Sequence, residues 1–455
     1  MTSLNIILAT VGSRGDVQPM VALARTLQGR GHSVTIAAPP DFGAWIEQEG
    51  FRFVPVGGDI KKYLHDNPDA LGGSAAEMYR SGKAFFDSQL QLQADDLRVA
   101  FQGADMVVWA GLAIAAVAVG EGMKLPVLGV VYSSCVVPSG RHAPPAFPRH
   151  GLPGWVNRVL WVINGYVTDK LVGGPFNALR EQFALPPVRF RKFMMQTELI
   201  IAADAGLMPL DEAWGPNIRR GNFIYLDDPR PLPSDLQAWL DDGEPPVYVG
   251  FGSMSGKGTD HVEKVVHEAL TATGRRCLIG AGWAGLGTRG MPSDPSRWRV
   301  VGEVSHQTLF PRMAAVVHHG GSGTTANALR AGVPQVVLPL ILDQFHHAHR
   351  LQLAGLAPKA ASMEKVTAQQ LSAAIEAAIA MPPEPRQAVA ARLRASDGAG
   401  AVADALEALT NSRPNLTPHS SPCLTCSSPM PRCRTAAPTC PSPCRTARSA
   451  KSPKA

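Results

Sequence analysis

Short runs of aliphatic residues, separated by segments of helical length, constrain the fold of this chain more than any other feature. In the first half these strand-like runs cover residues 6–8, 33–39, 51–56, 104–111, 125–133 and 198–204. A strand that is apolar along its whole length leaves no face for water, which is typical of a parallel sheet covered by helices on both sides. The sequence therefore predicts an α/β fold in which a parallel sheet occupies the first half.

The same alternation starts again after a stretch rich in Pro and Asp at residues 226–246. Strand-like runs follow at 247–253, 275–282, 298–304, 314–321 and 334–340. We therefore expect two Rossmann-like, doubly wound domains, residues 1–225 and 247–412, joined by a linker at 226–246. The length of 455 residues and the hydrophobic content of 45% are sufficient for two such cores. In folds of this kind, ligands bind at the carboxyl ends of the strands.

The last segment, residues 413–455, has a different composition. It contains seven basic residues, no acidic residue, many Pro and Ser, and five of the seven cysteines of the chain. We predict that this segment is disordered, because it has too few apolar residues to form a core. Cys423 and Cys426 have a spacing that also allows a zinc site, but the surrounding composition favours disorder.

Without that segment the chain is almost neutral, so its composition offers no argument for nucleic-acid binding. No apolar run has the length of a membrane-spanning helix. The first strand begins after four residues, which leaves no room for a signal peptide, and we expect a cytoplasmic protein.

The first strand is followed by Gly-Ser-Arg-Gly-Asp, residues 12–16. A strand, a glycine-rich loop and a helix start often hold a phosphate group, because the first N–H groups of a helix are unpaired. Asp16 conflicts with this role, since its carboxylate would repel a phosphate. From the spacing alone, Asp16 suits the N-cap of a helix beginning near Val17.

The strongest motif lies in the second half, where His-His-Gly-Gly-Ser-Gly-Thr-Thr covers residues 318–325. Its glycines let a ligand approach the backbone, and the helix expected from Ser322 begins without an acid, so this turn can bind a diphosphate. A turn needed only for packing would explain the glycines but not His319 together with Thr324. One strand later, Asp343 and Gln344 begin another helix, and this carboxylate and amide suit the hydroxyls of a sugar.

A histidine-rich run at residues 343–350 contains His346, His347 and His349, which invites a metal interpretation. His346, His349 and Arg350 fall within one helical turn. Beyond Asp343 they have no acidic or cysteine partner in range, so we favour a helix surface or the rim of a pocket over a metal site.

A second helical segment has alternatives that the sequence leaves open. Trp155, Val159, Val162 and Ile163 share one helical face, and Trp161 and Tyr166 lie nearby. This face would line a pocket for a lipophilic ligand, touch a membrane surface or pack as a core helix.

At this point a family resemblance is specific enough to state. Residues 318–344 resemble the donor-site signature of family 1 and family 28 glycosyltransferases of the GT-B fold. Residues 12–42 and 51–59 resemble the N-terminal domains of sterol glucosyltransferases and of vancomycin-group glycosyltransferases. The similarity covers about residues 4–410, and residues 61–89 would add a loop on the acceptor side.

The resemblance implies a role for each matching position. Asp16 aligns with the acid proposed as general base in the antibiotic enzymes, and Ser13 or Arg14 would reach the donor phosphate or order the loop. Asp343 and Gln344 would hold sugar hydroxyls. The diphosphate of a nucleotide sugar would be bound, and its leaving group stabilised, by Ser253, His319, Gly320, Gly321, Ser322, Gly323 and Thr324. The base of the nucleotide would contact residues 302–305, among them Gly302 and Val304.

Two positions depart from the plant members of the superfamily. Those members stack an aromatic side chain on the base, whereas no Trp stands near residues 301–305 here. They also bind the ribose with an acid, and Asn327 occupies roughly its position. These departures leave open whether the donor carries uridine or thymidine diphosphate.

The resemblance thus implies an inverting glycosyltransferase that moves a hexose, glucose, from a UDP-sugar to a hydroxyl of a lipophilic acceptor such as a sterol, lipid or polyketide. We expect no cofactor and no metal, and consider peripheral membrane contact. One alternative is a sugar-nucleotide epimerase, against which the first-domain acid and the Asp-Gln pair count. Another is a non-catalytic partner of a transferase, which would be expected to lose the donor motif.

Overall fold

The computed structural model describes residues 3–67, 74–254, 259–283, 285–287, 294–359 and 361–411. The disorder and the zinc alternative predicted for residues 413–455 concern a segment outside these residues. Among the described residues, no helix is long and apolar enough to cross a membrane.

The first half forms a parallel sheet of seven strands in the order β3-β2-β1-β4-β5-β6-β7. The strands are β1 (Asn5–Val11), β2 (Ser33–Ala38), β3 (Arg52–Pro55), β4 (Met106–Gly111), β5 (Val127–Val131), β6 (Leu199–Ile201) and β7 (Ile218–Arg220). Helices are α1 (Arg14–Gly29), α2 (Gly43–Gln48), α3 (Ile60–Asp66), α4 (Ala75–Ala100), α5 (Ala115–Gly122), α6 (Gly154–Thr168), α7 (Gly174–Glu181) and α8 (Phe190–Gln196). The six predicted strands are present, and β7 was not predicted because its three residues include two arginines.

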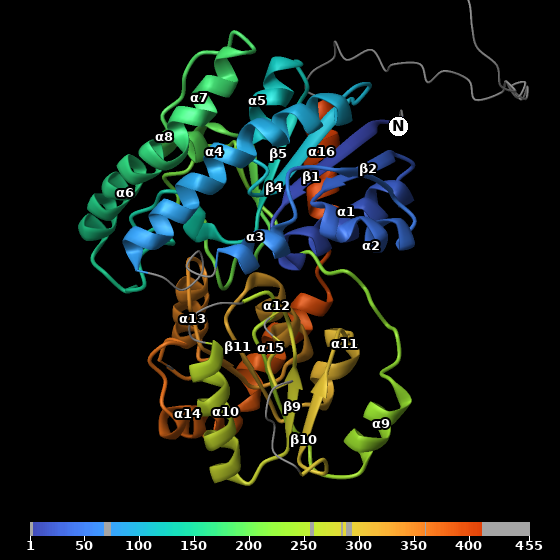
Figure 1. Ribbon diagram of the computed structural model, residues 1–455, viewed down its shortest axis with the longest axis vertical. Helices are drawn as coiled ribbons and strands as arrows, with labels where there is room; N and C mark the ends of the chain where they lie inside the picture. Colours follow the sequence, from blue (N-terminus) through green and yellow to red (C-terminus); the bar gives the residue numbers. More distant parts are fainter. Residues whose placement is uncertain are drawn as a thin grey trace, which may run out of the picture. The chain divides into compact units, whose positions relative to one another are not determined.

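The second half forms a parallel sheet of five strands in the order β10-β9-β8-β11-β12. Its strands are β8 (Val247–Gly250), β9 (Cys277–Gly280), β10 (Trp298–Val301), β11 (Ala315–His318) and β12 (Gln335–Val337). Its helices are α10 (Thr259–Thr273), α11 (His306–Leu309), α12 (Ser322–Ala331), α13 (Gln344–Leu353), α14 (Ala368–Ala380) and α15 (Pro383–Arg394). The prediction of two doubly wound parallel-sheet domains is confirmed (Figure 1).

Each face of the first sheet has its own hydrophobic core, which explains why its strands are apolar throughout. Ile7 of β1 pairs in register with Val107 of β4, and both belong to the core on one face. Their neighbours Ile6 and Met106 belong to the core on the other face. Successive side chains of a strand point to opposite faces, so a sheet covered on both sides needs an apolar residue at every position.

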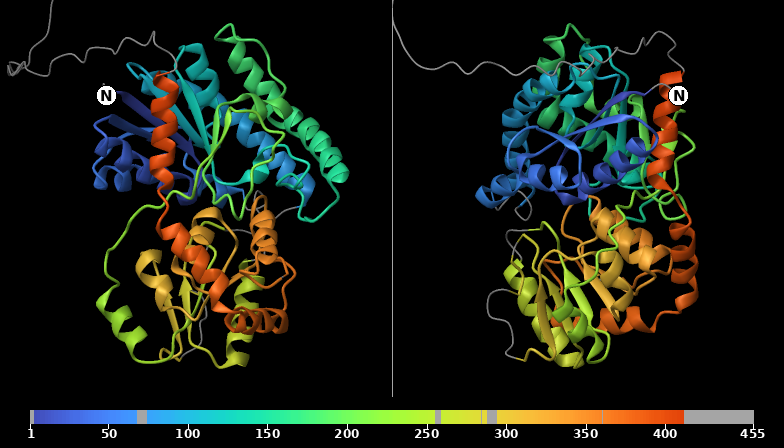
Figure 2. Two further views of the ribbon diagram at one scale, coloured as in Figure 1. Left: turned by 180° about the vertical axis from the view of Figure 1, so that it is seen from behind. Right: turned by 90° about the vertical axis from the view of Figure 1, so that its right-hand side faces the viewer.

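Two helices differ from the expected organisation. The last described helix, α16 (Gly398–Asn411), packs on α1, and its Val402 and Leu406 share a core with Leu23 and Leu27 of that helix. Figures 1 and 2 show α16, at the red end of the colour scale, beside the strands of the first sheet. The sequence range expected for the second domain, 247–412, therefore ends in a helix that packs on the first.

The expected linker and the expected loop are also partly helical. Residues 226–246 contain α9 (Ser234–Asp241), whose Leu236 and Leu240 are buried against the second sheet. Residues 61–89 consist largely of α3 and α4, so the loop expected there is wrong for the described part of the range. In both ranges, apolar side chains at helical spacing favoured a helix although the overall composition is polar.

Both sheets have a switch point where strand order reverses. In the first sheet it lies between β1 and β4, and in the second between β8 and β11. The turns that follow these strands diverge to opposite faces, which leaves a crevice at their carboxyl ends. The Gly-Ser-Arg-Gly-Asp and His-His-Gly-Gly turns follow β1 and β11 and therefore occupy these two points.

Candidate active site

The turn after β1 is organised by a capping box. Helix α1 begins at Arg14 with Ser13 as its N-cap, and Asp16 is the third helical residue. The Ser13 N–H donates to Asp16 Oδ2 at 2.8 Å, and the Gly15 N–H donates to Ser13 Oγ at 3.3 Å. The alternative of Asp16 as N-cap near Val17 is wrong, because a Ser followed three residues later by an acid forms the reciprocal cap one turn earlier.

Two glycines make room for the Asp16 carboxylate at the switch point of the first sheet. A Cβ on Gly12 would lie 2.2 Å from Asp16 Oδ2, and one on Gly111, at the end of β4, would lie 3.1 Å from Oδ1. Within the described part of the chain, no hydrogen bond uses Oδ1, whereas Oδ2 serves the cap. The cap therefore leaves one carboxylate oxygen available.

The surroundings of Asp16 raise its pKa to about 6. Burial is the largest cause, the hydrogen bond from the Ser13 amide acts in the opposite direction, and the charge of Asp343 raises the pKa further. A carboxylate with such a pKa is ionised at neutral pH and is a stronger base than an ordinary aspartate.

The turn after β11 presents the start of α12. Gly320 has a φ of +91°, a conformation that favours glycine. Its N–H donates to His318 Nδ1, and its carbonyl accepts a hydrogen bond from His347 Nδ1. The N-cap of α12 is Gly321, which offers no side-chain acceptor to the first N–H groups of the helix. Uncapped N–H groups and the helix dipole make this end suitable for an anion such as a diphosphate.

His319 lies between the glycine turns that follow β8 and β11. A Cβ on Gly321 would lie 2.4 Å from His319 Nε2, and one on Gly252 would lie 3.4 Å from its Cε1. Ser253 is the next residue of the β8 turn and is partly buried. The structure thus places His319 between the start of α12 and the β8 turn, which also contains Ser253.

The imidazole of His319 is suited to donate a single hydrogen bond. Its side chain is buried, and its Nδ1 has no hydrogen-bond partner among the described residues. Burial, followed by the influence of His347, lowers the pKa of His319 to about 4. The ring is therefore neutral at neutral pH and carries one N–H.

Asp343 and Gln344 have different surroundings. Gln344 is buried, and its Oε1 accepts the N–H groups of Leu340 at 2.9 Å and Ile341 at 3.0 Å. Its amide oxygen therefore stabilises its own turn, and its Nε2 contacts Met254 Sδ at 3.4 Å. The Asp343 side chain remains 31% exposed, so it is accessible to a ligand.

His347, which the sequence suggested only as a possible metal ligand, connects the two motifs of the second domain. Its Nδ1 donates to the carbonyl of Gly320 at 2.7 Å, and its Nε2 lies 3.7 Å from Asp343 Oδ2. His347 follows Asp343 by four residues, a spacing that places both on one face of α13 and is a signal for this contact.

Tyr132 connects the two sheets and was missed by the sequence analysis. The Ser322 hydroxyl donates to the carbonyl of Tyr132 at 3.2 Å, and the Tyr132 hydroxyl donates to the carbonyl of Asp16 at 3.0 Å. The start of α12 is therefore two hydrogen bonds away from the residue expected to act as base. Tyr132 directly follows β5, and its position at a strand end is the only sequence signal for a site role.

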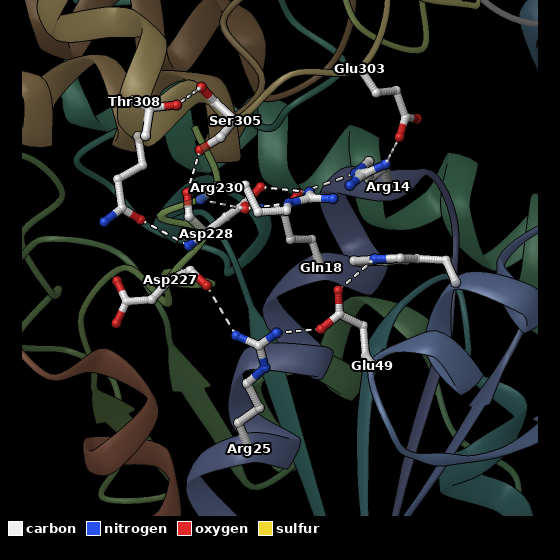
Figure 3. Close-up of polar contacts among 12 residues, drawn as sticks. Arg14, Gln18, Arg25, Glu49, Asp227, Asp228, Arg230, Glu303, Ser305 and Thr308 are labelled. Atoms are coloured by element: carbon white, nitrogen blue, oxygen red, sulfur yellow. Dashed lines mark hydrogen bonds and ion pairs between the residues drawn. The ribbon is translucent and has the colours of Figure 1, made fainter. Parts of the chain in front are cut away.

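Arg14 contacts residues 302–305, the segment expected to bind the base of the nucleotide, instead of the glycine-rich turn. Figure 3 shows its guanidinium directed at the carboxylate of Glu303, with which it forms an ion pair. The same group lies 4.5 Å from the ring centroid of Trp45. In this structure Arg14 therefore connects α1 to residues 302–305.

Residues 302–305 are held in place by Asp228, which lies in the connection between the two sheets. The Ser305 hydroxyl donates to the Asp228 carbonyl at 2.6 Å (Figure 3). The Asp228 N–H donates to Gln307 Oε1 at 2.9 Å. Val304 packs on the core of the second domain, whereas Gly302 is exposed. Asn327 donates to the carbonyl of Gly323 at 2.9 Å and so contacts its own helix.

The histidines of α13 meet two histidines of the first domain. His346 lies 5.2 Å from His142 and 5.3 Å from His150, and His349 stacks on His150 at 5.6 Å, all between ring centroids. His346 is buried, which contradicts the first of the two expected positions, a helix surface, and leaves the rim of a pocket as a prediction. Among the described residues, no group of three or more His, Cys, Asp or Glu side chains has the arrangement of a metal site.

Comparisons with known proteins agree with this geometry. Residues 6–127 match the glycosyltransferase family 28 N-terminal domain, and residues 287–407 match the C-terminal domain of the erythromycin biosynthesis protein CIII-like family. The chain is 35% identical over 420 residues to vancomycin aglycone glucosyltransferase of Amycolatopsis orientalis, which covers 91% of this chain and 100% of that protein.

Two further relatives widen the range of activities. A dTDP-epi-vancosaminyltransferase of the same organism is 35% identical over 83% of this chain and 90% of its own length. A sterol 3-beta-glucosyltransferase of Arabidopsis thaliana is 30% identical over 82% of this chain, and the match spans 60% of its length.

Among solved structures, the glycotransferase of kitacinnamycin has a TM-score of 0.68 at 19% identity and covers 90% of this chain and 100% of its own. At this level of identity, the likeness concerns the fold alone, which consists of two Rossmann-like sheets. The match to vancomycin aglycone glucosyltransferase shows more than the fold, because it extends over 91% of this chain at 35% identity. This chain, with its GT-B fold, therefore belongs to the glycosyltransferase family of the vancomycin-group enzymes.

Proposed function

We propose that this glycosyltransferase inverts the anomeric centre of its donor and moves glucose from UDP-glucose to a hydroxyl group of a lipophilic acceptor. The observation that carries the proposal is the position of Asp16, whose backbone is linked through Tyr132 to Ser322 at the start of α12. This link supports a reaction in which a base from one sheet acts beside an anion site from the other.

In the proposed reaction, Asp16 accepts the proton of the acceptor hydroxyl through its available Oδ1. The acceptor oxygen forms a bond to the anomeric carbon from the side opposite the diphosphate, while the bond from that carbon to the diphosphate oxygen breaks. The products are a glycoside of inverted configuration and a nucleoside diphosphate. A positioned base of this kind contributes typically 10²–10⁴-fold to the rate.

The departing diphosphate gains negative charge, and this chain offers two groups to stabilise it. The N–H groups at the start of α12 point out of the helix, and His319 supplies a neutral N–H beside them. We infer from this donor set that the helix start and His319 act in place of a metal ion or another cofactor. Asp343, with one side exposed, would accept hydrogen bonds from the sugar hydroxyls.

The choice of donor and acceptor rests on the relatives. Vancomycin aglycone glucosyltransferase and the sterol 3-beta-glucosyltransferase support glucose as the sugar, and the sterol enzyme supports a lipophilic acceptor. The dTDP-epi-vancosaminyltransferase supports thymidine diphosphate as the rival nucleotide. Donor competition with UDP-glucose and dTDP-glucose at equal concentration therefore tests the nucleotide directly.

The function is tested by mass spectrometry of reactions with both donors and a panel of sterols, polyketides and hydroxy fatty acids. A product heavier by one hexose, with the β-anomeric configuration by NMR when the donor is α-linked, is the expected result. Asp16→Asn should abolish most of the product. The absence of a glycoside with every acceptor, with only epimerised or intact nucleotide sugar, would contradict the proposal.

Asp105→Asn is the matched control. Asp105 Oδ2 accepts the N–H of Asn5 at 2.8 Å, so it also binds a backbone amide beside β1 and β4. It lies at the amino ends of these strands, whereas Asp16 lies at their carboxyl ends. Transfer by the Asp105 variant should be close to that of the unmodified enzyme.

A further inference from the structure

Helix α6 presents a continuous apolar face that no described part of the protein covers. Its side chains are between 42% and 68% exposed, and the face consists of Trp155, Val159, Val162, Ile163, Tyr166 and Val167. Successive members are separated by one, three or four residues, so they form one stripe along the helix. The core-helix alternative therefore does not hold for these side chains.

The opposite side of α6 attaches the helix to the first domain. Asn157 and Gly165 are its buried residues, and α8 packs against it. Trp161 donates through Nε1 to the carbonyl of His142 at 3.0 Å. Figure 1 shows α6 at the outer edge of the first domain, beside α8. The stripe is thus a stable feature of a packed helix.

Cationic side chains border this stripe. Arg158 and Lys170 are exposed and continue the same helical spacing, and the Lys170 ammonium lies 4.7 Å from the ring centroid of Tyr166. Arg149 before the helix and Lys192 of α8 are exposed as well. Helix α6 contains no acidic residue, and the next acid, Asp169, accepts the N–H of Phe190.

This combination distinguishes a lipid surface from other partners. An apolar stripe with basic margins and amphipathic aromatic rings is typical of a helix that lies in the headgroup region of an anionic bilayer. A second copy of the chain would bring Arg158 and Lys170 near their own counterparts, which repel each other. With 15 residues, α6 is about 22 Å long, so it would lie along the bilayer and not across it.

We propose that the exposed face of α6 docks this enzyme on the surface of an anionic bilayer. The apolar stripe enters the boundary between headgroups and acyl chains, and Arg158 and Lys170 contact lipid phosphates. His142, which α6 holds through Trp161, lies against His346 of α13, so the docked helix is connected to the contact between the two domains. The proposal does not depend on the identity of the sugar or of the acceptor.

Vesicle flotation of the full chain tests this surface without donor or acceptor. The protein should float with vesicles of phosphatidylcholine and phosphatidylglycerol and much less with phosphatidylcholine alone. Val162→Asn should lower the partition coefficient about tenfold, because an apolar side chain no longer enters the boundary. Replacing both Arg158 and Lys170 with Gln should reduce the preference for the anionic vesicles.

Val99→Asn is the matched control, since Val99 is 67% exposed on α4 and Val162 is 61% exposed. It should float like the unmodified protein, and all variants should keep its melting temperature. Equal flotation of the Val162 variant would overturn the proposal, because binding would then come from another segment. A dimer that the Val162 substitution dissociates, without flotation of the unmodified protein, would assign the stripe to a second copy and also overturn it.

Discussion

Asp16 combines a structural and a chemical role in one carboxylate, because Oδ2 caps α1 and Oδ1 is left available. Since its pKa is about 6 and the base must be ionised, kcat/KM should fall tenfold per pH unit below about pH 6 and level off above it. Steady-state kinetics from pH 5 to 8 measure this profile. The residual activity of Asp16→Asn should lack the inflection, and an inflection of the same pKa in that variant would assign it to another group.

The same pKa makes a prediction about stability. A carboxyl with a folded pKa above its unfolded value stabilises the folded state below about pH 4, and this contribution is lost as the pH rises through about 6. Asp16→Asn keeps the cap without the buried charge, so its stability relative to the unmodified enzyme should increase from pH 4 to 7 by about 1–3 kcal/mol. Urea unfolding at the two pH values measures the difference, and a pH-independent difference would contradict the burial of the charge.

His319 has a narrower role at the residue scale. Its replacement by Ala should remove one N–H from the diphosphate and weaken UDP binding by about 1–3 kcal/mol in calorimetry. His319→Gln keeps an N–H donor and should recover part of that affinity. If the Ala variant binds UDP and turns over like the unmodified enzyme, His319 is not part of the donor site.

At the scale of elements, the turn between β1 and α1 depends on Gly12. A Cβ there would lie 2.2 Å from Asp16 Oδ2, and the φ of +154° is unfavourable for other residues. Gly12→Ala should therefore displace the carboxylate, lower kcat by at least tenfold and cost about 1–3 kcal/mol of stability. Activity and thermal unfolding should be measured together.

The control for this turn is at the other end of the same helix. A Cβ on Gly29 meets no atom within 4 Å, so Gly29→Ala should leave kcat unchanged and stability equal or slightly higher. A Gly12 variant with normal kcat would show that the position of Asp16 tolerates the added methyl group.

At the scale of the whole molecule, the histidines between the domains should make the enzyme sensitive to acid. Burial lowers the pKa of His142 and of His150 to about 4, and that of His346 well below its ordinary value. The unfolded chain then binds more protons between about pH 6.5 and 4, so stability falls as the pH falls through this window. Each such group contributes a slope of up to about 1.4 kcal/mol per pH unit.

Calorimetric unfolding from pH 7.5 to 5 measures this slope. His142→Phe preserves an aromatic ring against Trp161 and Trp214 but removes a titrating group, so the slope should be shallower. His65→Gln, on the exposed side of α3, is the control and should leave the slope unchanged. Identical slopes for all three proteins would mean that the buried rings do not govern acid unfolding.

Much of the fold was accessible to local reasoning. The predicted strands at 33–39 and 334–340 appear as β2 and β12, and the helix expected from Ser322 begins there as α12. These features follow from apolar runs and glycine turns, which act over a few residues. A local error at the site, the start of α1, arose because Ser13 was treated as loop although it forms a capping box with Asp16.

By itself, then, the sequence determined two parallel sheets, the glycine turns at their strand ends and the residue types that those turns present, because strand, turn and cap preferences depend on neighbours along the chain. The tertiary structure alone decided which of these residues meet: Tyr132 lies 116 residues from Asp16 and 190 from Ser322. It also decided that α16 returns to the first sheet and that α6 leaves its apolar side exposed. Such contacts depend on how helices and sheets pack, and a pattern within one segment does not specify its partner.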